Sequence, residues 1–140
     1  RAAGESTEKS FKIAQDYIKS KPTLKGIIAI GVPNVPGAVD AVKQANKVGQ
    51  ISVIGNALPN MMRGYLKDGT IKSTLLWSAP DHGYLTVYAA RQLLTEGVAV
   101  GKPFKAGRMG TFTPKADKVS MSVALPVMVF TKDNVDQFNF

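Results

Sequence analysis

The chain has 140 residues, 44% of them apolar and 20% charged, which is typical of one globular domain and excludes a disordered tail. It has no cysteine, which excludes disulfide bonds, thiol catalysis and cysteine-bound metal. The formal net charge is +8, but the 18 basic residues are scattered and never form a run of five. We interpret the charge as a solvated basic surface, leave an acidic membrane surface or an acidic partner as alternatives, and expect no nucleic acid partner.

Neither a membrane span nor a targeting segment is visible. No apolar run approaches the roughly 20 residues that are needed to cross a bilayer. The opening residues Arg1 to Gly4 lack the charged-then-apolar pattern of a signal peptide. We therefore expect either that a signal was removed or that this chain starts downstream of one.

Helical and strand patterns alternate along the first two thirds of the chain. Ser6 or Thr7 can cap the first helix, and Gly49 is a C-cap candidate for the second. The first strand, Gly26 to Ile30, is a continuous apolar run, as expected of a strand covered on both faces. Helices are predicted over residues 6–20, 37–48, 59–67 and 81–96, and strands over residues 26–30, 51–55 and 71–76.

The character of the chain changes after Gly97, where glycines and prolines punctuate a loop-rich stretch. Two β-prone runs, over residues 118–124 and 127–131, precede a polar and aromatic tail at 133–140. The alternation of strands and helices before this point predicts an α/β fold: a parallel βαβ sheet with flanking helices.

Conspicuous side chains follow the predicted strands. Ligands of an open α/β sheet bind beyond the carboxyl ends of its strands, and Asn56 and Trp77 occupy two such ends. An amide can donate and accept hydrogen bonds, and an indole can stack on a sugar, so the pair suits a small polyhydroxylated molecule. A turn-making role for Asn56 and a core role for Trp77 remain open.

The loop that begins at Gly31 and Val32 and reaches Asn34 lies between a strand and a helix. Backbone N–H groups at such a helix start can face a ligand, although the loop can equally be an ordinary βα turn. We take Gly31, Val32, Asn34, Asn56 and Trp77 as the candidate ligand-binding residues.

Catalytic chemistry is poorly supported. The single histidine, His82, follows Asp81 at a predicted helix start, where a capping or surface role is expected. No second histidine or carboxylate cluster completes a triad or a metal site, and no glycine-rich nucleotide loop is present. We expect no enzyme activity, no cofactor and no metal.

Several motifs, taken together, resemble the C-terminal part of a type I periplasmic sugar-binding protein of an ABC transporter, in the branch that binds rhamnose and the autoinducer-2 furanose. The likeness covers nearly the whole chain. The residues that carry it are Pro59-Asn60-Met61-Met62-Arg63-Gly64-Tyr65, Lys67-Asp68-Gly69-Thr70-Ile71-Lys72, Leu76-Trp77 and the terminal run from Val129 to Phe140.

This resemblance implies a Venus flytrap architecture, with two α/β lobes and a sugar in the cleft between them. Residues 1–77 would be βα units of the second lobe, 78–117 a crossover helix and loop-rich segment of the first lobe, and 118–140 the return strands and tail of the second lobe. Some positions depart from the family. Ile30 and Gly31 replace the proline and aspartate of the autoinducer binders, and Asn56 and Ser78 stand where relatives often have carboxylates.

The resemblance also implies partners and a location. We expect a small sugar ligand, an ABC transporter permease, and either the missing N-terminal half or a swapped second copy to cover exposed apolar surface. The location would be periplasmic, or extracellular and membrane-associated. The alternative function is the sugar-sensing effector domain of a transcription repressor, which shares the fold and would need a DNA-binding segment upstream.

Overall fold

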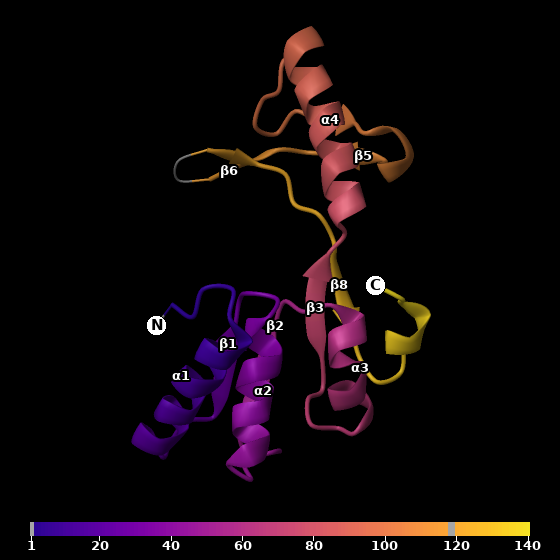
Figure 1. Cartoon of the computed structure of the whole chain (residues 1–140). Helices are drawn as coiled ribbons and strands as arrows, with labels where there is room; N and C mark the ends of the chain where they lie inside the picture. Colours follow the sequence, from indigo (N-terminus) through magenta and orange to yellow (C-terminus); the bar gives the residue numbers. More distant parts are fainter. Residues whose placement is uncertain (1, 118–119) are drawn as a thin grey trace. The chain divides into compact units, whose positions relative to one another are not determined.

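A computed structural model describes residues 2–117 and 120–140, which form two compact units (Figure 1). Unit 1 comprises Arg1–Leu76 and Val129–Phe140, and unit 2 comprises Trp77–Met128. The chain therefore passes between the units twice, once after Leu76 and once after Met128.

Unit 1 has the predicted alternation of strands and helices, in a parallel arrangement. β1 pairs with β2 in parallel, with Ala29 opposite Gly55, and an isolated parallel bridge between Asn56 and Leu75 joins β2 to β3. β3 in turn lies beside β8. The elements are α1 (Thr7–Ser20), β1 (Gly26–Ala29), α2 (Asn34–Gln44), β2 (Ser52–Gly55), α3 (Pro59–Lys67), β3 (Thr74–Trp77), β8 (Val127–Phe130) and the 3-10 helix η2 (Val135–Gln137).

Local sequence signals explain the ends of α1 and α3. The Ser6 hydroxyl accepts a hydrogen bond from the Lys9 N–H at 3.2 Å, which confirms Ser6 as the N-cap of α1. α3 ends at Lys67 because Gly69 takes a left-handed φ of 76°, a conformation that glycine adopts without steric cost.

The predicted bounds of the second helix were wrong at both ends. α2 begins at Asn34 rather than Gly37, because a proline in the first helical turn loses no intrahelical hydrogen bond. It ends at Gln44, and Asn46 rather than Gly49 takes the left-handed position after it, with φ 53°. The Lys47 N–H donates to the Val42 carbonyl at 3.0 Å, which closes the turn as a Schellman motif.

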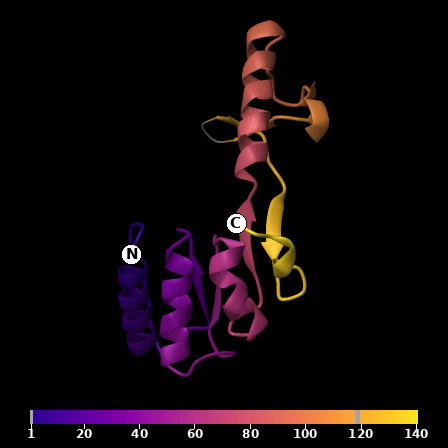
Figure 2. The same cartoon turned by 45° about the vertical axis from the view of Figure 1, so that its right-hand side comes forward.

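The expectation that the first strand is covered on both faces was also wrong. Ile28 is 78% exposed and Ile30 is 77% exposed, whereas Ala29 is buried beneath the helices. The steps from β1 to β2 and from β2 to β3 run in one direction, and right-handed crossovers then place their helices on the same face. Figure 2 shows α1, α2 and α3 side by side on that face, with the strands behind them.

β1 and β2 approach each other closely at Gly55. A Cβ atom at this position would lie 1.8 Å from the Ala29 carbonyl oxygen and 2.8 Å from Cγ2 of Val35. Val35 belongs to α2 and is fully buried. Glycine is therefore the only residue that lets the strand pair and the helix above it pack at this distance.

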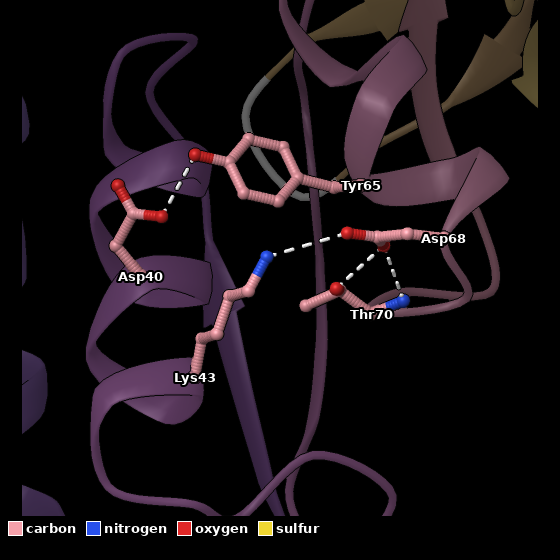
Figure 3. A network of polar contacts seen from close by, with 5 residues as sticks. All are labelled: Asp40, Lys43, Tyr65, Asp68 and Thr70. Atoms are coloured by element: carbon pink, nitrogen blue, oxygen red, sulfur yellow. Dashed lines mark hydrogen bonds and ion pairs between the residues drawn. The ribbon is translucent and has the colours of Figure 1, made fainter.

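Polar contacts join α2 to α3 and to the turn that follows it (Figure 3). The Tyr65 hydroxyl donates to the Asp40 carboxylate at 2.7 Å, and the Lys43 ammonium lies 3.3 Å from the Asp68 carboxylate. Asp68 also accepts a hydrogen bond from the Thr70 N–H at 2.9 Å. Burial, together with the neighbouring Asp40 carboxylate, raises the pKa of Tyr65 to about 12.

Unit 2 packs its strands and turns against one helix. Its small core contains Leu85, Phe104 and Ala106. β4 pairs with β5 and β6 pairs with β7, both in antiparallel fashion, and the residues of β6 and β7 are exposed. The β-prone run over 118–124 includes positions 118 and 119, which lie outside the described residues. The elements are α4 (Ala79–Thr95), β4 (Phe104–Lys105), the 3-10 helix η1 (Gly107–Met109), β5 (Thr111–Phe112), β6 (Lys115–Ala116) and β7 (Met121–Ser122).

Substitution of Gly55 by alanine tests the close approach of the strands. We expect G55A to lower the free energy of unfolding by about 2–4 kcal/mol, since the added methyl group overlaps backbone atoms. The matched control is Gly64→Ala in α3, where a Cβ meets no atom within 4 Å. It should raise stability by about 0.5–1 kcal/mol. Urea unfolding measures both, and an equal effect of the two variants would contradict this account.

The Tyr65 contact predicts a dependence on high pH. The folded-state pKa of about 12 exceeds the unfolded value of about 10, so its stabilisation is complete below pH 10 and is lost as the pH rises through 12. The difference in tyrosinate absorbance between the wild-type chain and Tyr65→Phe isolates this phenol. Its midpoint should lie near pH 12; a midpoint near pH 10 would show that the contact does not persist in solution.

Candidate functional site

Most of the predicted ligand-binding residues lie just beyond the carboxyl ends of β1 and β2. Because the strands are parallel and Ala29 lies opposite Gly55, the segments that follow them leave the sheet at the same edge. Gly31, Val32 and Asn34 follow β1, and Asn56 follows β2 directly. The structure thus brings these four residues to one edge of unit 1.

Asn34 is the first residue of α2 and folds back over Gly31. A Cβ on Gly31 would lie 2.6 Å from Nδ2 of Asn34, so the amide occupies the space that any larger residue would fill. The Asn34 N–H donates to the Gly31 carbonyl at 2.9 Å, and the Ser10 hydroxyl donates to the Asn34 carbonyl at 2.8 Å. The loop and the start of α2 are therefore held by both backbone and side-chain contacts.

The side-chain oxygen of Asn34 has an unusual environment. Oδ1 is buried, yet it accepts no hydrogen bond from the residues that the structure describes. A buried polar atom without a partner costs about 1–3 kcal/mol, and native proteins tolerate few of them. The unpartnered Asn34 oxygen is therefore a cost that the other contacts of the loop and of α2 must offset.

A hollow of about 490 Å³ lies between α1 and β1. Asn34 and Ser10 are the polar side chains on its wall, and the rest is mainly apolar, including Ile13, Tyr17 and Ile27. Asn56 is not part of this wall. The apolar surface offers few partners for sugar hydroxyl groups, so we do not assign the sugar site to this hollow.

Backbone contacts fix the position of Asn56. It forms the bridge to Leu75, and the next N–H, that of Ala57, donates to the Leu75 carbonyl at 3.1 Å. The buried Thr74 hydroxyl donates to the Gly55 carbonyl at 2.7 Å and ties the same two strands together. Asn56 is half-buried and thus neither sealed in the core nor fully solvated.

Trp77 is the last residue of β3 and the first residue of unit 2. It is 45% exposed, so it is not sealed in aliphatic packing. Within unit 2 it borders an open depression of about 310 Å³ together with His82, Val123 and Leu125. The indole therefore has an accessible face, as a stacking role requires.

The sequence analysis did not predict the contacts that Arg108 of η1 makes with α4 in unit 2, an ion pair and a cation–π contact. Arg108 pairs with Asp81 at 2.6 Å and lies over the Tyr84 ring, 4.6 Å from its centroid. The Arg108 guanidinium and then the Ser78 hydroxyl lower the pKa of Asp81 through hydrogen bonds. A Cβ on Gly107 would lie 2.3 Å from the Tyr84 hydroxyl, so only glycine leaves room for this contact. Gly107, in a glycine-rich stretch, was thus the sequence feature that pointed to a close approach here.

The structure also bears on metal binding, on membrane insertion and on the role of the residues around His82. Among residues 2–117 and 120–140, no three acidic or histidine side chains gather as a metal site. No helix in the same part of the chain is long and apolar enough to cross a membrane. Ser78 caps α4 by accepting a hydrogen bond from the Asp81 N–H at 3.2 Å, and His82 lies in the first turn of this helix.

Comparison with known proteins identifies the family. Residues 1–98 match the periplasmic binding protein domain, and the chain belongs to this family. The family is extracytoplasmic, and its members are non-enzymatic solute-binding proteins. A D-ribose/D-allose-binding protein of Pseudomonas aeruginosa is 30% identical over 87 residues, which cover 62% of this chain and 27% of that protein.

Solved structures share the fold. A sugar ABC transporter protein from Actinomyces odontolyticus is 29% identical, with a TM-score of 0.75, and the match covers 99% of this chain and 44% of that one. LsrB from Clostridium saccharobutylicum, solved with AI-2, has 23% identity and a TM-score of 0.75 over 99% and 47% of the two chains. A solute-binding protein from Clostridium phytofermentas with bound L-rhamnose has 19% identity and a TM-score of 0.77 over 96% and 46%.

These matches also show how much of each relative's length the chain covers. It spans 44% to 47% of the length of these three structures and 27% of the curated relative. The fold is therefore that of a periplasmic-binding-protein-like α/β domain, present here over a part of the relatives' length.

The unpartnered oxygen of Asn34 predicts an asymmetry between two neighbouring polar residues. Asn34→Ala should change the free energy of unfolding by less than about 0.5 kcal/mol or raise it, because it removes a buried unpaired atom. Ser10→Ala should lower it by about 1 kcal/mol, because it removes a hydrogen bond of 2.8 Å. Urea unfolding compares them, and a loss of about 2 kcal/mol in N34A would instead assign the amide a structural role.

Proposed function

We propose that this chain is part of an extracytoplasmic solute-binding protein that binds a small sugar, or a sugar-like furanose, for import by an ABC transporter. The observation that carries the proposal is the match of residues 1–98 to the family, together with the gathering of Gly31, Val32, Asn34 and Asn56 at one strand edge. The named relatives are sugar-binding or sugar-transport proteins, which supports a sugar as the class of ligand.

Each candidate residue has a chemical role in this proposal. The loop of Gly31 and Val32 offers backbone groups at the start of α2. Asn34, the first residue of that helix, would have to turn its buried side-chain oxygen outward to accept a hydrogen bond from a sugar hydroxyl. The Asn56 amide is a neutral hydrogen-bonding anchor, and Trp77 supplies a flat face for stacking. Neighbours that hold L-rhamnose or AI-2 support these two molecules as the first ligands to test.

A receptor of this kind needs two lobes, and this chain would supply parts of both. We assign residues 1–77 and 118–140 to the second lobe and residues 78–117 to a piece of the first. The two crossings of the chain between compact units, after Leu76 and after Met128, support such a division. Ligand contacts made only in the closed state would then drive a hinge closure of the two lobes around the sugar, a motion for which periplasmic binding proteins are a standard case.

The partners follow from this arrangement. Helix α4 exposes Val87, Leu93 and Leu94, each at least 60% accessible, and this supports a covering surface supplied by the missing N-terminal half or by a swapped second copy. An ABC permease would recognise the closed receptor. The location would be periplasmic, or extracellular and membrane-associated.

Titration with L-rhamnose tests the proposal on the 140-residue chain. Trp77 is the single tryptophan, so its fluorescence reports directly on a sugar at its face. We expect saturable binding with a Kd of about 1 mM or weaker, because many contacts of a whole receptor are absent. Asn56→Ala should weaken binding about tenfold, as the loss of a hydrogen-bonding anchor implies.

Asn139→Ala, at the exposed tail, is the matched amide control and should leave the titration unchanged. AI-2 and D-allose titrations then rank the ligands by the same signal. Micromolar binding by this chain alone would overturn the two-lobe assignment. The absence of any saturable response to all three compounds, in a chain shown to be folded by circular dichroism, would overturn the assignment of the site.

A further inference from the structure

The first turn of α3 has no cap from its own sequence. Leu58 occupies the N-cap position and offers no side-chain hydrogen bond. Pro59 follows and has no N–H, so Asn60 carries the first backbone donor that the helix itself leaves unsatisfied. This N–H donates to the carbonyl of Phe140 at 3.2 Å, which caps the helix with a residue distant in sequence. The side chains of Asn60 and Asn139 add only an exposed contact at 3.3 Å, which this cap does not need.

Arg63, one turn further along α3, binds the same part of the chain, residues 135–140. Its guanidinium donates to the Phe138 carbonyl at 2.6 Å, and its Nε lies 3.3 Å from the Asp136 carboxylate. The Lys67 ammonium lies 2.6 Å from the other oxygen of that carboxylate. Hydrogen bonds from charged donors are stronger than neutral ones, and the Arg63 side chain is only 33% exposed. Arg63 is thus the main side-chain tie between α3 and residues 135–140.

Aromatic packing fixes residues 135–140 to the sheet as well. Phe138 and Phe140 each pack edge-on against Phe130, with ring centroids 4.8 Å and 6.2 Å from it. Phe130 is fully buried and belongs to β8, which lies beside β3. Residues 135–140 are therefore held both by the sheet and by α3, beside which they lie (Figure 1).

The loop that carries Asn56 leads directly into this helix start. At one end of the loop, Asn56 bridges Leu75, and the Ala57 N–H donates to the Leu75 carbonyl. At the other end is the capped N–H of Asn60. Ala57 and Pro59, between the two ends, are fully buried. The loop is therefore fixed by β3 at one end and by residues 135–140 at the other.

We propose that residues 135–140, held by Arg63, are a positioning element for the Asn56 amide. This rests on the proposed function, in which that amide binds a sugar hydroxyl. Residues 135–140 contact no ligand themselves: they hold the start of α3, and the start of α3 holds the loop. A binding group is effective when the residues behind it fix its position. Loosening residues 135–140 should therefore weaken sugar binding, although every group that contacts the sugar remains.

Amide hydrogen exchange, followed by NMR, tests the positioning without a ligand. Arg63→Ala removes the contacts of this side chain and should let the loop open locally. We expect the exchange rate of the Ala57 N–H to rise about tenfold more than that of the Ile54 N–H, inside β2. The matched control is Tyr65→Phe, which removes a contact of the same helix with Asp40 of α2. It should change the exchange rates of both amides by the same factor.

Titration with L-rhamnose, read from Trp77 fluorescence, tests the consequence for binding. R63A should raise the Kd about threefold, less than the about tenfold expected of N56A, because the amide remains and only its placement is loosened. Y65F should leave the Kd unchanged. Asp136→Asn, at a carboxylate 60% exposed, weakens the tie to Arg63 and should show smaller changes in the same exchange rates and Kd. The test therefore does not depend on the folding of R63A.

Two results would overturn the proposal. One is an R63A variant in which the Ala57 and Ile54 exchange rates change by the same factor, because residues 135–140 would then add only to global stability. The other is a wild-type chain that binds L-rhamnose and an R63A variant that binds it with the same Kd. A wild-type chain that binds no sugar would instead count against the proposed function, and the exchange rates alone would then decide the positioning. Circular dichroism confirms the folding of each variant.

Discussion

The contact between β1 and β2 at Gly55 is the constraint on which unit 1 depends. With no side chain at this position, the Ala29 carbonyl and the buried Val35 approach the β2 backbone more closely than any Cβ would permit. The parallel register that results brings Gly31 and Asn56 to a common edge. The placement of the proposed ligand groups therefore follows from a packing requirement in the core, and no interaction among those groups is needed to create it.

The helices of unit 1 stabilise one face of the sheet and leave the other open. Right-handed connections that step in one direction place α2 and α3 on one face, and α1 lies beside them, so Ile28 and Ile54 remain exposed. A parallel sheet is ordinarily covered on both faces. In unit 1, as far as the structure describes it, the face that carries Ile28 and Ile54 thus lacks an apolar cover.

The proposed site combines rigid and solvent-accessible parts. Asn56 is fixed by the strand bridge to Leu75, and the loop at Gly31 is fixed by the start of α2. Trp77 stands at a boundary between two compact units and keeps an accessible face.

The sequence by itself determined the order and type of the elements of unit 1, since helical periodicity, the Ser6 cap and the stop at Gly69 are local signals. It also determined the family, through motifs spread over the chain. It did not determine the bounds of α2. Local rules favour a helix that starts after Pro36 and ends before a left-handed Gly49, whereas Pro36 lies in the first turn and Asn46 takes the left-handed position after the helix. Only the tertiary structure decided which face of β1 is exposed, that the side-chain oxygen of Asn34 is buried without a hydrogen-bond partner, and that Arg108 contacts α4. These depend on crossover direction and on contacts between residues distant in sequence, which no local pattern encodes.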